Sequence, residues 1–150
     1  MPFSSSDGWQ LLRGRLSFTG AAGFGAQGLH TIATVTGQVE IKFPMVYCSE
    51  ALAGALATID LGVTGLETQF FGANVATDVA LGDWIPAGGD QPTIADYGGT
   101  SGTERYALSA NIILDVDSAD ITNGQLDFFV WFRLLSAGAS LTLGPNLVAT

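Results

Sequence analysis

The stretch TVTGQVEIKFPMVY, residues 34–47, decides the fold class of this chain. Its even positions are polar apart from Pro44 and Val46, and its odd positions carry Val35, Gly37, Val39, Ile41, Phe43, Met45 and Tyr47. Because successive side chains of a strand point to opposite faces, the alternation predicts a strand with one buried and one solvated face. Such a strand is typical of an antiparallel sheet with one face on a core, and not of a buried parallel sheet.

Further strand patterns follow along the chain. Residues 58–64 alternate, with Ile59, Leu61 and Val63 predicted to point inward. Residues 106–116 and 126–135 are predicted as long strands, and residues 141–143 as a short closing strand. Phe129 and Trp131 enrich the second face of residues 126–135, so that strand is expected to be covered on both sides.

Other segments leave alternatives open or signal breaks. Residues 49–57 fit a loop or a short helix, and residues 66–75 fit a short helix or a strand. The dipeptide Asn123-Gly124 predicts a turn. Residues 29–48 are predicted as a strand pair, and Gly37 in its middle fits a bulge or bend. Pro44 lacks an N–H group, which indicates an edge strand or a change of sheet at that position.

The chain of 150 residues is most simply one folded unit with an amino-terminal extension. We expect residues 1–28 to form an arm or loop-rich segment packed on a β-sandwich domain of residues 29–150. Within the arm, Ser6 and Asp7 fit the cap of a helical turn that runs through Leu12, a short strand covers residues 13–18, and the glycine-rich residues 20–28 are a loop. The pattern predicts an all-β, jelly-roll-like antiparallel β-sandwich with at most one or two short helices.

Charge narrows the possible partners. The chain is 47% hydrophobic and only 13% charged, about half the usual charged share, and charge-poor surfaces are typical of obligate interfaces. Fourteen acidic residues face five basic ones, for a net charge of −9. This balance argues against binding to nucleic acids or to anionic membranes. It favours simple solubility over steering toward a basic partner.

The sequence offers no assembled chemistry, so we expect no catalytic residue, no cofactor and no metal site. Cys48 is the single cysteine and His30 the single histidine, which leaves one possible base for any nucleophile and too few ligands for zinc. The stretch GAAGFG, residues 20–25, lacks the strand and helix of a phosphate-binding loop. Paired carboxylates for glycoside hydrolysis are not predicted in so short a chain.

The stretch DVDSAD, residues 115–120, is the one acidic cluster. It lacks the glycine and the distant glutamate of an EF-hand calcium loop. We interpret it as a polar connection, with a weak surface cation site as the alternative.

Aromatic residues are candidates for recognition. Trp9, Trp84 and Trp131, with Tyr97 and Tyr106, form either a sugar-binding platform or packing and interface anchors, and packing is favoured. Trp84 and Tyr97 flank the loop-like residues 82–102, so they are the better candidates for contacting a ligand.

Three stretches carry a family resemblance. TIATVTGQVEIKF (residues 31–43), IDLGVTGLETQFFG (residues 59–72) and ADITNGQLDFFVWFRLLSAGASLTLG (residues 119–144) resemble small virion proteins of tailed bacteriophages. The resemblance implies a jelly-roll capsid decoration, or cement, protein that binds the outside of a capsid and stabilises it. It implies the major capsid protein and further copies of the chain, as a homodimer or homotrimer, as partners. The protein would then belong to the virion and be assembled in the host cytoplasm.

The resemblance also suggests an interface. The amino-terminal arm would reach over a neighbour, with Phe3, Trp9 and Phe24 as its anchors, and Trp84 and Tyr97 would add contacts from the long loop. Two alternatives stay open: a carbohydrate-binding jelly-roll module that uses Trp84 and Tyr97, and a structural component of a phage neck or tail. The first residues carry no signal-peptide pattern, in keeping with cytosolic synthesis.

Overall fold

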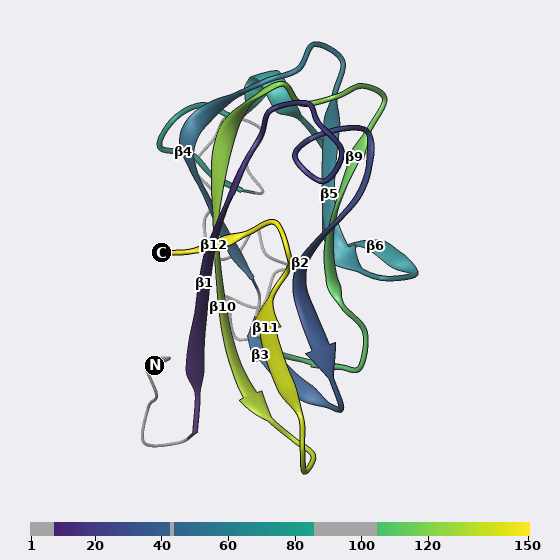
Figure 1. The fold of residues 1–150 in the computed structure, drawn as a ribbon, viewed down its shortest axis with the longest axis vertical. Helices are drawn as coiled ribbons and strands as arrows, with labels where there is room; N and C mark the ends of the chain where they lie inside the picture. The colour runs from purple at the N-terminus through teal and green to yellow at the C-terminus, as the bar shows by residue number, and fades with distance from the viewer. Residues whose placement is uncertain (1–7, 43, 86–104) are drawn as a thin grey trace.

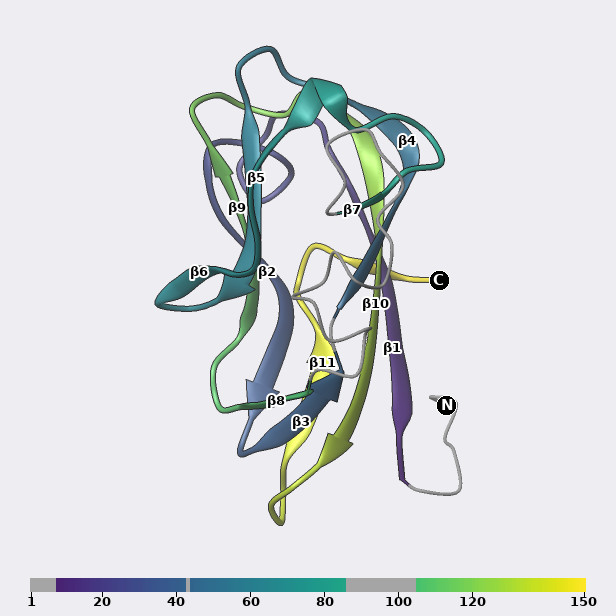
Figure 2. The ribbon, with the colours of Figure 1, turned by 180° about the vertical axis from the view of Figure 1, so that it is seen from behind.

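The computed structural model describes residues 8–42, 44–85 and 105–150, which form two antiparallel sheets packed face to face (Figures 1 and 2). The larger sheet contains β1 (Gln10–Ser17), β3 (Val39–Lys42), β4 (Met45–Ala53), β7 (Trp84–Ile85), β8 (Arg105–Leu108), β10 (Asn123–Leu134) and β12 (Val148–Ala149). The smaller sheet contains β2 (Gly28–Thr36), β5 (Thr58–Val63), β6 (Leu66–Val75), β9 (Ile112–Asp117) and β11 (Ser140–Leu143). A 3-10 turn, η1 (Ala76–Asp78), accompanies them.

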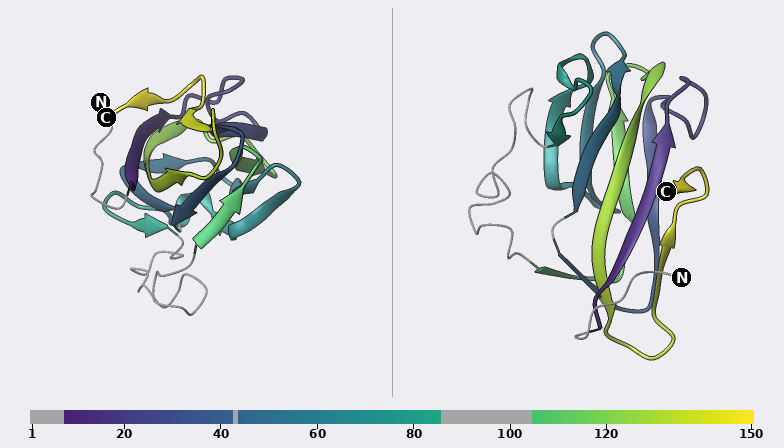
Figure 3. Two further views of the ribbon diagram at one scale, coloured as in Figure 1. Left: turned by 90° about the horizontal axis from the view of Figure 1, so that it is seen from below. Right: turned by 90° about the vertical axis from the view of Figure 1, so that its left-hand side faces the viewer.

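The chain crosses repeatedly from one sheet to the other, so the predicted all-β, jelly-roll-like antiparallel sandwich is confirmed. Strand β10 organises the larger sheet. It pairs with β1 along one side and with β3 and β4 along the other, and Figure 3 shows β1 and β10 running side by side down the molecule. The inward side chains of β10 are at most 4% exposed and belong to one core with the inward residues of β5 and β9: Leu126, Phe128, Val130, Phe132, Ile59, Leu61, Ile112 and Leu114.

The stretch that predicts the fold class contributes to three strands, and the predicted bend at Gly37 is the point at which the chain changes sheets. Strand β2 ends at Thr36, and Gly37, with a φ of 67°, turns the chain from the smaller sheet into β3 of the larger one. Val39 and Ile41 are fully buried, as predicted. Beyond residues 43–44 the buried side changes parity: Val46 and Cys48 point inward, whereas Met45 is 43% exposed. The expectation that Met45 and Tyr47 share the buried face is therefore wrong.

Pro44 marks an interruption and neither an edge nor a change of sheet. It is buried between β3 and β4, and both strands pair with β10 on one side. On their other side β3 pairs with β8 and β4 pairs with β7. The missing N–H of Pro44 thus coincides with the break at which the buried face shifts by one residue.

Three other expectations need correction. The predicted helical turn through Leu12 is wrong: all eight residues of β1 pair with β10, so residues 10–17 belong to the larger sheet instead of to an arm. Residues 49–53 continue β4 as a strand, in place of a loop or helix. The predicted strand over residues 106–116 is β8 and β9, which lie in different sheets.

The dipeptide Asn123-Gly124 begins β10 and is not a turn. The pairing of β10 with β4 shifts register there, and Gly124 has a φ of 116°. A Cβ atom on Gly124 would lie 2.7 Å from the carbonyl oxygen of Ala51, so the close approach at this bulge requires glycine. The remaining strand predictions are confirmed by β5, β10 and β11, the ambiguous residues 66–75 are β6, and residues 18–27 form the predicted loop.

Candidate functional site

The outer face of the larger sheet holds every lysine and arginine of the chain. Residues paired across an antiparallel ladder project to the same side, so the register fixes this placement: Arg133 lies opposite Glu40, and Lys42 opposite Arg105. On β1 the outward positions alternate with the buried Leu16. We call this surface the basic face; its cations are Arg13, Arg15, Lys42, Arg105 and Arg133.

Two carboxylates lie beneath the cations of the basic face. The Nε and Nη2 groups of Arg15 donate to the two oxygens of Asp127 at 2.7 and 3.0 Å. The Nε of Arg133 donates to Glu40 at 2.8 Å, and Nη1 of Arg105 lies 3.7 Å from the same carboxylate. The arginine side chains are 37–56% exposed, but those of Asp127 and Glu40 only 11% and 13%. The positive groups therefore face outward.

These ion pairs position charge more than they stabilise the fold. Hydrogen bonding and charge attraction from Asp127 raise the pKa of Arg15, so this guanidinium keeps its charge at any accessible pH. The Ser49 hydroxyl donates to the same carboxylate at 3.3 Å. Because the arginines are partly solvated, each pair contributes about 0–1 kcal/mol to stability. Their main consequence is a fixed array of donors at the surface.

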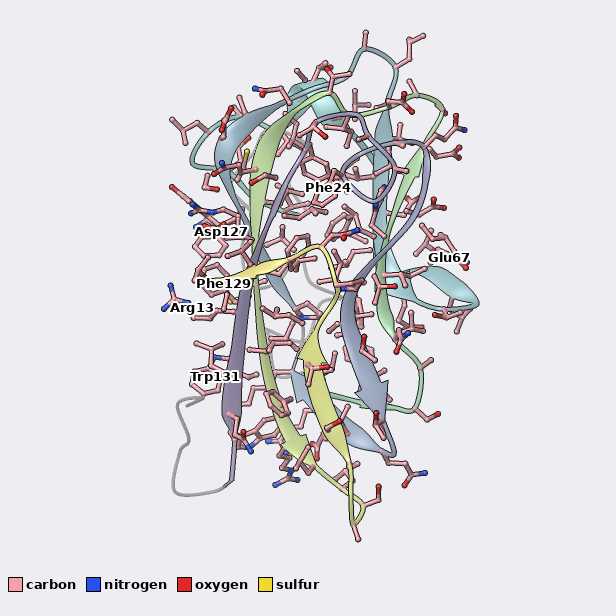
Figure 4. The ribbon with its side chains drawn as sticks, in the orientation of Figure 1. Arg13, Phe24, Glu67, Asp127, Phe129 and Trp131 are labelled. Atoms are coloured by element: carbon pink, nitrogen blue, oxygen red, sulfur yellow. The ribbon has the colours of Figure 1, made fainter. Side chains whose placement is uncertain are left out.

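An aromatic cluster lies beside Arg13 on the same face. Trp84 of β7 packs against Tyr47 of β4, with ring centroids 5.0 Å apart, and against Phe129 of β10, at 5.8 Å. The Arg13 guanidinium lies 5.3 Å from the centroid of the Phe129 ring. In Figure 4 Arg13, Phe129 and Trp131 point away from the core on the same side of the molecule.

Trp9, just before β1, contacts three cations of the basic face through its indole ring. Its residue is only 3% exposed, and its ring lies 4.7 Å from Lys42 Nζ, 5.0 Å from the Arg133 guanidinium and 5.7 Å from that of Arg105. Cations over an indole ring are attracted by its quadrupole, by about 0.5–2 kcal/mol each. The buried Trp9 ring thus holds three cationic side chains in place by cation–π contacts.

The structure brings together only part of the predicted interface. Trp9 and Trp84 lie on the basic face, one buried and one half-buried. Phe24, 37% exposed, lies in the loop that joins β1 to β2, away from the labelled residues of that face (Figure 4). Phe3 and Tyr97 lie outside the described residues. The sequence analysis did not identify the cations as candidate site residues. The pattern that could have identified them is that Arg13, Arg15, Lys42 and Arg133 occupy outward positions of strands.

The outer face of the smaller sheet is acidic. Asp60 of β5 pairs with Asp115 of β9, and both alternate with fully buried residues, as does Asp117. Figure 4 shows Glu67 on the opposite side of the molecule from Arg13 and Phe129. Burial, followed by repulsion from Asp117, Asp60 and Glu67, raises the pKa of Asp115. The two outer faces of the sandwich therefore carry opposite charge.

Replacing Asp115 by asparagine is expected to stabilise the fold at neutral pH. A carboxyl whose pKa is raised by folding contributes stability below its unfolded pKa and loses it as pH rises through the folded value. At about pH 7 the ionised Asp115 is therefore unfavourable, and Asp115→Asn removes the repulsion. Thermal unfolding should show a higher Tm for the variant at about pH 7 and a smaller difference at about pH 3.5. An equal difference at both pH values would contradict the argument.

The two remaining potentially reactive side chains, His30 and Cys48, are buried and hydrogen-bonded to backbone carbonyl groups. His30 is 5% exposed, with its Nε2 2.8 Å from the Ala26 carbonyl oxygen. Cys48 is fully buried in β4 of the larger sheet, whereas His30 lies in β2 of the smaller one. The Cys48 thiol donates to the Glu50 carbonyl at 3.1 Å, and burial raises the pKa of this thiol. Within the described ranges no three histidine, cysteine or acidic side chains are grouped to hold a metal ion.

The acidic stretch of residues 115–120 is a polar connection only in part: Asp115 and Asp117 lie in β9, and residues 118–120 form the predicted connection. The Gln27 backbone N–H donates to Asp120 at 2.8 Å, and its side-chain amide donates to Asp117 at 3.3 Å. The Ser118 N–H donates to Asp117 at 2.7 Å. The two aspartates therefore fasten the loop of residues 18–27 to the end of β9.

An apolar groove of about 870 Å³ lies between β1 and β11, where the two sheets part. Leu12, Leu141 and Leu143 line it, and β12 pairs with β1 only at Gly14 and Arg15.

Comparisons with known proteins give one structural likeness. No family model and no curated protein sequence matches the chain. The fold is similar to a chain of the cyanophage Pam1 capsid asymmetric unit, with a TM-score of 0.37 and 15% sequence identity over 90% of this chain and 89% of that one. No helix in the described part of the chain is long and apolar enough to cross a membrane.

Proposed function

We propose that this chain is a structural virion protein that binds the outer surface of a bacteriophage capsid and stabilises it as a decoration protein. The observation that carries the proposal is the outer face of the larger sheet, on which Trp84, Tyr47 and Phe129 lie among arginines. Aromatic residues and arginine are the residue types enriched at the energetic centres of protein interfaces. The resemblance of residues 31–43, 59–72 and 119–144 to small phage virion proteins supports the same function.

The proposed mechanism is adhesion over a surface and not turnover at an active site. A homodimer or homotrimer would place two or three such faces on neighbouring capsid subunits. Linked binding faces raise the effective concentration of each further contact, so modest individual affinities suffice to tie capsid subunits together. The protein would then reside in the virion, after assembly in the host cytoplasm, with the major capsid protein as its partner.

The aromatic cluster favours protein contact over a sugar platform. Its rings are tilted, at 54° between Tyr47 and Trp84 and 48° between Trp84 and Phe129, so they do not share one flat surface. Each ring uses part of its area to pack against the next.

The test uses capsids of the phage that encodes this chain, prepared without the protein. We expect the added protein to sediment with the capsids at a saturable stoichiometry and to raise their thermal disruption temperature. Light scattering should give a dimer or trimer for the free protein. Saturable binding confined to necks or tails, seen by electron microscopy, would replace the decoration function with that of a neck or tail component. Absence of binding to any part of the particle would refute a role in the virion.

A further inference from the structure

We propose that the basic face is the surface that contacts the partner and that the partner presents an acidic protein surface there. The inference rests on the proposed function and adds to it the binding face, the chemistry of the partner and the orientation of the bound protein. The smaller sheet, with its acidic outer face, would point away from the capsid.

The distribution of charge carries the first step. The described residues include ten acidic side chains, and two of them, Glu40 and Asp127, lie beneath the arginines of the basic face. A third, Glu50, lies opposite Gln125 of β10 on the same sheet, away from the arginine pairs. The other seven lie on the smaller sheet or outside the strands: Asp60, Glu67, Asp78, Asp83, Asp115, Asp117 and Asp120. In a chain with a net charge of −9, all five cations are nevertheless on one face. Solubility alone does not require this segregation, since dispersed charges would serve it as well.

Screening makes the two faces act separately. Stacked sheets lie about 10 Å apart, and the Debye length at physiological salt is about 8 Å. A partner close to the basic face therefore feels the nearby guanidinium groups more strongly than the carboxylates of the other sheet. An acidic surface would repel the protein in most orientations and attract it in one, which gives both steering and a fixed orientation.

The aromatic cluster supplies contact area at the same place. Trp84, Tyr47 and Phe129 hold one another in position, and Met45, opposite Phe129 on β4, is 43% exposed. Arg13 is held over the Phe129 ring, and none of the ion pairs among the described residues includes it. Side chains that are already ordered lose little entropy on binding, so such a surface is prepared for contact.

Two double variants with the same net charge test the face. Arg13→Gln with Arg105→Gln removes two positive charges from the basic face. Thr36→Glu with Thr68→Glu adds two negative charges to the smaller sheet, at exposed positions of β2 and β6. Each double variant lowers the formal net charge by two units, so a difference between them reports the position of the charge and not its sum. Circular dichroism and thermal unfolding confirm that both are folded.

The measurement is the Kd for capsids prepared without the protein, at about 50 and 500 mM NaCl. We expect the arginine variant to bind about tenfold or more weakly at low salt, and the threonine variant within about twofold of the original protein. Added salt should weaken binding of the original protein more than that of the arginine variant.

Two results would overturn the inference while leaving the proposed function intact. In one, the original protein binds capsids and the two variants bind equally. In the other, the arginine variant loses self-association by light scattering without capsids, which would make the basic face the contact between copies. If the original protein fails to bind capsids at all, the proposed function and the inference both fall.

Discussion

Replacing Phe128 by alanine is expected to lower the free energy of unfolding by about 3–5 kcal/mol. Phe128 is 2% exposed at the middle of β10 and is the largest of the fully buried side chains. Its neighbours across the sheet are Gly14 of β1 and Val46 of β4. Val46 is fully buried, and the space beside Gly14 is filled by Leu143 of β11, so the surroundings of Phe128 are closely packed. The loss combines the transfer free energy of the ring with the cost of a cavity between the two sheets.

Phe129, the next residue of the same strand, provides the matched control. Its ring lies on the outer face, half-buried, against Trp84 and Arg13. Phe129→Ala should cost clearly less stability than Phe128→Ala, because water can fill the space that it leaves. Chemical denaturation measures both free energies of unfolding from the midpoint and the slope. In capsid binding the order should reverse, with Phe129→Ala giving the larger loss of affinity. Equal stability losses would mean that β10 does not divide core from outer face as described.

The fold class was predictable because it follows from local alternation. Strands β5 and β10 bury at least every second residue, and the core residues of β10 appear in the sequence as an unbroken period of two. The connections were less predictable. Gly37 occupies a position of regular alternation, so the pattern alone does not show that the chain changes sheets there.

The shift at residues 43–44 has a signal that is clear only in retrospect. Val46 is the one apolar residue on the polar parity besides Pro44, and it is fully buried. Taken as an isolated exception to the alternation, Val46 indicates only an imperfect strand. In the structure it is the first inward residue after the break, and Cys48 continues the new parity. A proline followed by an apolar residue on the wrong parity therefore indicates an interruption between collinear strands.

The candidate site was predictable only in part. Strand parity places Arg13, Arg15 and Arg133 on outward faces, but it does not show that these faces belong to one sheet. That depends on long-range pairing, such as Arg133 with Glu40, and on β8 joining the larger sheet although β9 lies in the smaller one. Trp9 was expected as an anchor for a neighbour. Its burial shows that it supports the cations of its own chain.

Replacing Trp9 by alanine is expected to cost about 3–5 kcal/mol of stability and to make the remaining stability depend on salt. The indole lies within 5.7 Å of three cationic groups, those of Lys42, Arg105 and Arg133, and is itself 3% exposed. Removing the ring creates a cavity and also removes the negative ring faces that hold these like charges together. Repulsion between the cations then acts against the fold, with Glu40 as the carboxylate between two of them.

Salt dependence separates this electrostatic role from packing alone. Between about 50 and 500 mM NaCl, screening should recover more stability in Trp9→Ala than in the original protein, because the repulsion weakens as the Debye length falls. Trp9→Phe keeps an aromatic face and should lose less stability, with a salt response close to that of the original protein. Denaturant unfolding at the two salt concentrations measures all three. If Trp9→Ala and Trp9→Phe respond equally to salt, Trp9 acts through its volume alone, and the cations are held in place by their carboxylate partners.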